Sequence, residues 1–220
     1  MENHVVAEKK PNPSLFKMFT SPSEQFEKIK ENPKIWVSLI IVSILSALGA
    51  FLIANGMDTP TLEGISAEQA ASISMIGKVT AVIGGLLGPI IAILIGSAVQ
   101  LIITKIADSG ATYKQLLSMN TYIYIIGAVG VLLNAGIRLA IGGNSQVNVT
   151  SIAGLLNSDK PGVLNSIELF AIWGLILTAI GLHKVGNLSK GVAWTIAIIF
   201  FLISVGFALL GTAFQGGVGA

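Results

Sequence analysis

Few side chains in this sequence could do chemistry, and they are widely separated. There is no cysteine, which excludes disulfides, thiolate nucleophiles and zinc–thiolate sites. The two histidines, His4 and His183, do not form a pair at metal-ligand spacing, and we expect His183 to be a solvated loop residue. No Walker A loop and no G-x-S-x-G motif occurs. The sequence therefore predicts no catalytic residue, no metal site and no cofactor.

Four polar or charged residues interrupt the apolar segments, and we predict that they gather near one end of the folded chain. A charge inside a membrane is costly and is usually paired or functional. Arg138 and Glu168 are predicted to lie at similar depth, so they could form an ion pair, with Lys78 as a competing partner. Alternatively, Arg138 extends to the surface and Glu168 faces water in a loop. The predicted outer-rim polar cluster consists of Lys78, Asn134, Arg138 and Glu168.

Small or polar residues recur every four positions in the second apolar segment, which places them on one slowly turning helix face. Such faces let two helices approach closely. The face would pack either inside the chain or against another subunit; a substrate path is a third interpretation. Its residues are Gly84, Gly88, Ala92, Gly96 and Gln100.

The segments that must position these residues are apolar enough to cross a membrane. Hydrophobic residues make up 53% of the 220 residues and charged residues 11%, whereas an average soluble domain carries about 25% charge. A membrane-spanning helix needs about 20 mostly apolar residues. We therefore predict an all-α integral membrane protein with five spans, near 35–55, 77–105, 119–141, 163–183 and 192–213.

Basic residues are distributed unequally between the two sides that these spans define. The side with more lysine and arginine near the span ends is normally cytoplasmic. Lys78, Arg138 and Lys160 fall on one side. The other ten fall together on the opposite side, which predicts a cytoplasmic N-terminus and an external C-terminus: Lys9, Lys10, Lys17, Lys28, Lys30, Lys34, Lys105, Lys114, Lys184 and Lys190.

The segment before the first span predicts an amphipathic helix. Ser21, Pro22 and Glu24 fit the N-cap, N1 and N3 positions of a capping box, and the helix should end near Glu31. Aromatic and apolar residues beside lysines suit a helix lying in the membrane interface, or one packed over the inner ends of the bundle. The predicted interfacial residues are Phe16, Phe19, Phe26 and Ile29.

These observations divide the chain into four parts. We predict a disordered leader at 1–12 and an amphipathic cytoplasmic or interfacial segment at 13–33. The five-helix membrane domain follows at 34–213, and an external tail occupies 214–220.

Three features of the sequence resemble the Yip family, the five-helix membrane proteins first known as Ypt/Rab-interacting proteins. The first is the leader from Phe19 to Ile29, followed by Pro33 and Trp36. The second is the connection 111–118, Ala-Thr-Tyr-Lys-Gln-Leu-Leu-Ser. The third is the number and orientation of the spans. The Asp-Leu-Tyr-Gly-Pro type motif of the eukaryotic members is missing, so the resemblance does not imply a Rab GTPase partner. It also implies no catalytic residues.

The leader and short loops are most similar to those of bacterial members, one of which accompanies a MacB-like ABC exporter that protects cells against a secreted toxic peptide. The resemblance therefore implies a non-catalytic accessory protein of the bacterial plasma membrane. Its expected partners are the lipid bilayer and the membrane subunits of an ABC exporter, with a second copy of the chain as an alternative, but not nucleic acid. The alternative is a small permease that uses a polar face of the second to fourth spans. An unrecognised membrane enzyme comes third.

Overall fold

The computed structural model describes residues 11–57, 64–158 and 162–217, and these residues form helices joined by loops. Four helices are long and apolar enough to cross a membrane, and α7 is shorter. The prediction of an all-helical membrane protein is therefore confirmed. The helices are η1 (Phe16–Met18), α1 (Pro22–Glu31), α2 (Trp36–Asn55), α3 (Ala67–Ile106), α4 (Tyr113–Ile141), α5 (Ile152–Leu155), α6 (Val163–Ser166), α7 (Leu169–Lys184) and α8 (Lys190–Gly217).

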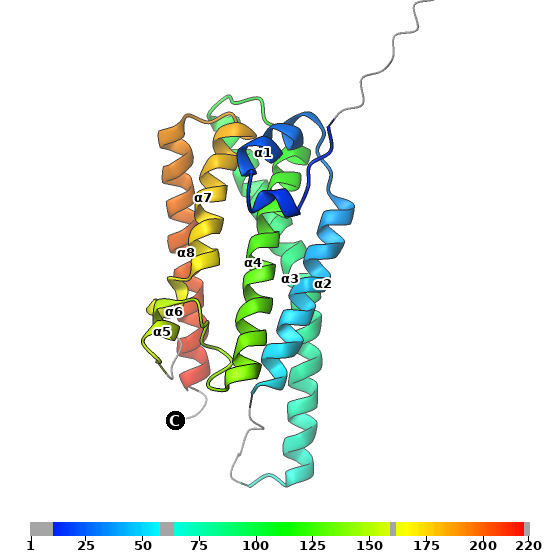
Figure 1. The fold of residues 1–220 in the computed structure, drawn as a ribbon, viewed down its shortest axis with the longest axis vertical. Coiled ribbons are helices and arrows are strands. Elements are labelled where there is room, and N and C mark those ends of the chain that lie inside the picture. Colours follow the sequence, from blue (N-terminus) through cyan, green and yellow to red (C-terminus); the bar gives the residue numbers. More distant parts are fainter. Residues whose placement is uncertain (1–10, 58–63, 159–161, 218–220) are drawn as a thin grey trace, which may run out of the picture.

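The long helices run side by side, and α1 lies across one end of them (Figure 1). Helices α2, α3 and α4 pack against one another, α7 packs on α4, and α8 packs on α7. We call the end covered by α1 the leader end. The opposite end is the loop end, where the segment 142–168 carries α5 and α6.

Two of the long helices begin six or more residues before their predicted starts. Helix α3 starts at Ala67, ten residues before the predicted start, and has 40 residues. At 1.5 Å per residue it is roughly 60 Å long, about twice the hydrocarbon thickness of a bilayer. Figure 1 shows it extending past its neighbours at the loop end. Capping boxes explain both starts: Ser66 with Gln69 before α3, and Thr112 with Gln115 before α4.

The predicted span 163–183 is not continuous. The chain forms the short helix α6, breaks at Ile167 and Glu168, and continues as α7 from Leu169. Glu168 is the N-cap of α7, and its side chain accepts a hydrogen bond from the Ala171 backbone N–H. An N-cap residue has non-helical backbone angles, so the capping acid itself ends the helical continuity. The apolar composition alone does not indicate this break.

The leader helix has the predicted limits but not the predicted cap. Ser21 is the N-cap residue and Pro22 the first helical residue, yet the Ser21 side chain makes no capping hydrogen bond. Glu24 instead forms an ion pair with Lys28 at 2.5 Å, and this bond holds the pKa of the Glu24 carboxyl below its ordinary value. The helix ends at Glu31, just before Pro33, as expected from the conformation that proline imposes on its predecessor.

Both predicted tails fall partly outside the described residues. Residues 1–10 and 218–220 are not described. Asn12 has no regular secondary structure, but its side-chain oxygen accepts a hydrogen bond from Asn32 at 3.0 Å. At the other terminus α8 continues to Gly217, so the predicted tail 214–220 begins as helix.

Candidate functional site

Four residues of the predicted stripe on α3 have open space beside them, although Gly88 and Gly96 are half-buried. A Cβ added at Gly84, Gly88 or Gly96 would meet no other atom within 4 Å, and Ala92 is exposed. Among the described residues, none occupies the Cβ positions of these glycines, and the interpretation of this face as a docking surface for another subunit stays a prediction. A neighbouring glycine makes the internal contact: a Cβ at Gly85 would stand 2.8 Å from the Ser46 carbonyl oxygen of α2. Because Gly84 and Gly85 are consecutive residues, the uncovered face and the face that packs on α2 lie next to each other around the helix.

Gln100, the fifth residue of the predicted stripe, lies inside the bundle. It is 3% exposed, and its side-chain oxygen accepts a hydrogen bond from Asn120 of α4 at 2.7 Å. The same Asn120 amide also donates to the Ser97 hydroxyl at 2.8 Å. These bonds join α3 to α4. We did not single out Asn120 from the sequence, although an amide inside an apolar span is a signal for such an interhelical bond.

Two residues of the predicted polar cluster meet at the loop end around a third that we had not predicted. Glu168 is buried, and its Oε1 accepts hydrogen bonds from the Thr150 hydroxyl and from Asn134 Nδ2. Asn134 is also buried, and its Oδ1 accepts the Thr150 backbone N–H at 2.9 Å. Residues from α4, the connecting segment and the start of α7 thereby fix the loop to the bundle. We call Asn134, Thr150 and Glu168 the loop-end network.

The other two residues of the predicted cluster do not join this network. Arg138 donates from Nε to the Val147 carbonyl oxygen at 2.9 Å and forms no ion pair within 4.0 Å among the described residues. Arg138 thus bonds to the connecting segment at Val147, and Glu168 bonds to it at Thr150. Lys78 lies against α2, in a groove that Ala54 and Met57 also line. The predicted four-residue cluster is therefore a buried Asn134–Glu168 pair with two separate cations.

The predicted interfacial residues of the leader differ in their surroundings. Phe26 and Ile29 of α1 are fully buried, and Phe19 packs against the same core, whereas Phe16 is 82% exposed. Helix α1 packs on α7 and α4. A Cβ at Gly181 of α7 would stand 3.2 Å from the Phe26 ring, which shows how closely the two helices approach. Of the two alternatives for this segment, packing over the ends of the bundle describes α1, and only Phe16 projects outwards.

Polar bonds strengthen the attachment of the leader. Lys184 forms an ion pair with Glu27 at 2.6 Å, and Lys30 donates to the Asn187 side chain at 2.5 Å. His183, which we expected in a solvated loop, is instead a half-buried residue of α7. Its Nδ1 lies 2.7 Å from the Leu188 carbonyl oxygen and donates to it. The two lysine contacts join α1 to α7 and to the α7–α8 connection, and the His183 contact holds that connection to α7.

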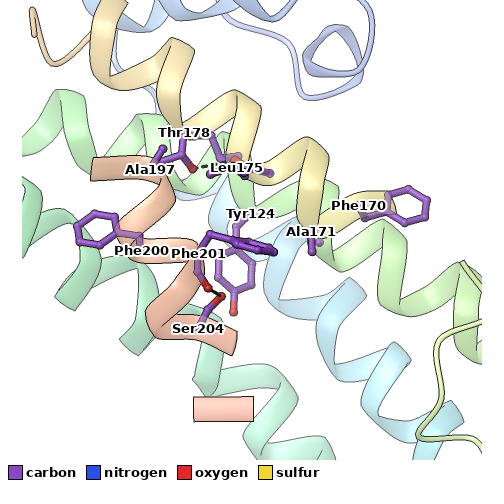
Figure 2. A pocket seen from close by; sticks show the side chains of 12 residues that line it. Tyr124, Phe170, Ala171, Leu175, Thr178, Ala197, Phe200, Phe201 and Ser204 are labelled. Carbon is purple, nitrogen blue, oxygen red and sulfur yellow. Dashed lines mark hydrogen bonds between the residues drawn. The ribbon is translucent and has the colours of Figure 1, made fainter. Parts of the chain in front are cut away.

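A cleft of about 270 Å³ lies between α4, α7 and α8 (Figure 2). Tyr124, Phe170 and Phe201 give it aromatic walls. The hydroxyls of Thr178 and Ser204 donate to backbone carbonyls of their own helices, as the dashed lines in Figure 2 show. Apart from the Tyr124 hydroxyl, the cleft therefore offers mainly apolar surface.

These features define a multi-pass protein of the cell membrane, with apolar helices, a packed leader and an uncovered face on α3. Within the part of the chain that the structure describes, no group of three His, Asp or Glu side chains could hold a metal ion.

The chain belongs to the Yip1 domain family, whose model matches residues 16–211. It is 38% identical over 216 residues to membrane protein YknW from Bacillus subtilis (strain 168), with 94% of each chain covered. This confirms the resemblance stated from the leader and the 111–118 connection. No solved structure matches the chain.

Proposed function

We propose that this chain is a non-catalytic accessory protein that assembles with the membrane subunits of an ABC exporter and modulates its action in resistance to a toxic peptide. The leader end would be cytoplasmic, and all five apolar helices would cross the membrane. The exporter and the peptide come from the family resemblance. The assembly role rests on one structural observation, the uncovered small-residue face of α3.

That face has the properties of a helix-docking surface. Its glycines have open space where a Cβ would stand, while the side chains of Leu87, Ile91 and Ile95 around them are exposed. Lipid tails are as apolar as these side chains, so helix association in a membrane depends on close packing rather than on the hydrophobic effect. A glycine-lined face permits that close packing. A partner helix could therefore pack there more closely than on any leucine-lined face.

The polar groups inside the bundle support assembly more than transport. Gln100 and Asn120 bond to each other, and Asn134 and Glu168 bond within the loop-end network. A permease needs polar groups near the middle of the membrane that can bind a substrate. Here the hydrogen-bonding capacity of these side chains is largely used inside the protein.

Replacement of Gly88 or Gly96 by leucine tests the assembly role. We expect each variant to fold, because the added side chain enters open space, but to recover at least tenfold less exporter subunit when the tagged protein is isolated from native membranes. Gly206→Leu on α8 is the matched control, since a Cβ there also meets nothing within 4 Å. Undiminished recovery with both α3 variants would overturn the proposal. If these variants lose self-association but still recover the exporter subunit, the face binds a second copy of this chain instead.

The permease alternative has its own test. The purified chain, reconstituted alone in vesicles, should show no flux of peptide substrates. Flux that requires no exporter subunit would establish the permease and end the accessory role.

A further inference from the structure

At the leader end, α1, α7 and α8 line a second cavity, of about 410 Å³, which is open on one side and has a cationic lining. The charged and polar residues around it are Ser23 of α1, His183 and Lys184 of α7, and Lys190 of α8, together with the indole of Trp194. We propose that this cavity binds the phosphate of an anionic phospholipid headgroup. We call it the headgroup cavity.

The charges of the cavity favour an anion. Lys190 has no acid within 4.0 Å among the described residues, and it stands in the first turn of α8. A cation at a helix N-terminus is disfavoured by the helix dipole, whereas an anion there is favoured. A phosphate beside Lys190 would therefore relieve an unfavourable arrangement. No other described group compensates this charge by an ion pair.

Lys184 can take part although it already pairs with Glu27. Its ammonium group carries three donors, and the ion pair at 2.6 Å uses one of them. Both side chains of that pair are substantially exposed, so the pair itself adds little stability and competes only moderately for the lysine. Glu27 should therefore weaken phosphate binding without preventing it.

The position of the cavity points to a lipid rather than to free phosphate. Trp194 is 42% exposed at the start of an apolar helix, where indoles commonly mark the membrane interface. Ile198 and Leu202 follow it one and two turns further along α8, and both are exposed. A headgroup in the cavity would thus have its acyl chains along an apolar helix face. The volume, many times the roughly 30 Å³ occupied by a water molecule, admits a phosphate with its glycerol.

Lipid binding to the purified full-length protein tests the proposal. In native mass spectrometry we expect phosphatidylglycerol to remain bound and phosphatidylcholine to dissociate. Lys190→Gln should reduce the bound fraction of phosphatidylglycerol at least fivefold, and Glu27→Gln should increase it. Lys105→Gln is the matched control, because it removes an exposed lysine from α3 at the same end of the bundle without touching the cavity.

The same variants distinguish specific binding of the lipid in the cavity from a general attraction of anionic lipid to surface lysines. Phosphatidylglycerol should raise the Tm of the wild-type protein and of Lys105→Gln by about 3–6 °C, and that of Lys190→Gln by much less. An equal loss of binding in Lys105→Gln and Lys190→Gln would overturn the proposal, as would equal retention of phosphatidylcholine. Glycerol 3-phosphate should give no comparable shift. A full shift with this soluble phosphate would assign the cavity to free phosphate and overturn the lipid assignment.

Discussion

At the scale of single residues, several buried polar side chains form small sets that satisfy one another, whereas Gln25 Nε2 and Ser43 Oγ are buried without a hydrogen-bond partner among the described residues. Glu168 accepts hydrogen bonds from a hydroxyl, an amide and a backbone N–H, all of them neutral. Asn134 donates within the same network and also to the Gly130 carbonyl oxygen of its own helix at 2.9 Å. A buried polar group is expensive when it lacks a partner, so each member of such a set depends on the others.

The loop-end network should therefore behave as one unit. We expect Glu168→Ala to lower the free energy of unfolding by about 1–3 kcal/mol, because three donors lose their acceptor. Thr150→Val should also destabilise the protein. The double variant should lose less than the sum of the two, which thermal or denaturant unfolding in detergent can measure. Strict additivity would mean that the two side chains act independently.

At the scale of the elements, glycines decide which faces of the helices can meet. Gly85 of α3 lies against the backbone of α2, and Gly130 of α4 against the Phe170 ring of α7. Gly84, one residue before Gly85, has open space around it. The same residue type therefore has a packing role at one position and leaves a surface uncovered at the next.

Adjacent alanine substitutions should show this difference. Gly85→Ala would place its methyl group 2.8 Å from the Ser46 carbonyl oxygen and 2.9 Å from the Ala47 Cα, so α2 and α3 must separate. Overpacking of this kind costs about 1–3 kcal/mol. Gly84→Ala should be neutral, or stabilising by up to about 1 kcal/mol through helix propensity. Unfolding of both variants in the same detergent is the measurement. Equal destabilisation would contradict the conclusion that Gly85 faces α2 and Gly84 does not.

At the scale of the whole molecule, the two ends of the bundle differ in charge and covering. The leader end has α1 packed across it and most of the lysines. The loop end has Arg138, Lys78 and the segment held by Glu168. This asymmetry supports one orientation in the membrane, with the leader end in the cytoplasm.

Reporter fusions should give the corresponding topology. A reporter inserted near Asn187, in the connection between α7 and α8, should read as cytoplasmic, and one fused after residue 220 should read as external. The reason is the ten-to-three distribution of lysine and arginine between the two sides. A C-terminal reporter that reads as cytoplasmic would show that one of the five apolar helices does not cross the membrane.

The sequence by itself determined which segments are apolar enough for membrane helices, because a charge is too costly to leave inside lipid and its absence over about 20 residues is visible in one dimension. It also determined the family, through the leader and the 111–118 connection. It could not determine which face of α3 is covered. Between residues 81 and 96 that helix carries no polar side chain, so no polar face indicates its rotation there, and Gly84 and Gly85 look alike in the sequence.

Only the tertiary structure decided which distant polar residues meet. Glu168 was predicted at the same depth as Arg138, either paired with it or facing water, but it caps α7 and bonds to Thr150 and Asn134. His183, Lys184 and Lys190 come together with Trp194 and with Ser23 of the leader. Such contacts depend on how the loops return to the bundle and on where α1 docks. These are set by side-chain packing between segments far apart in the chain, and neither helical periodicity nor charge spacing specifies them.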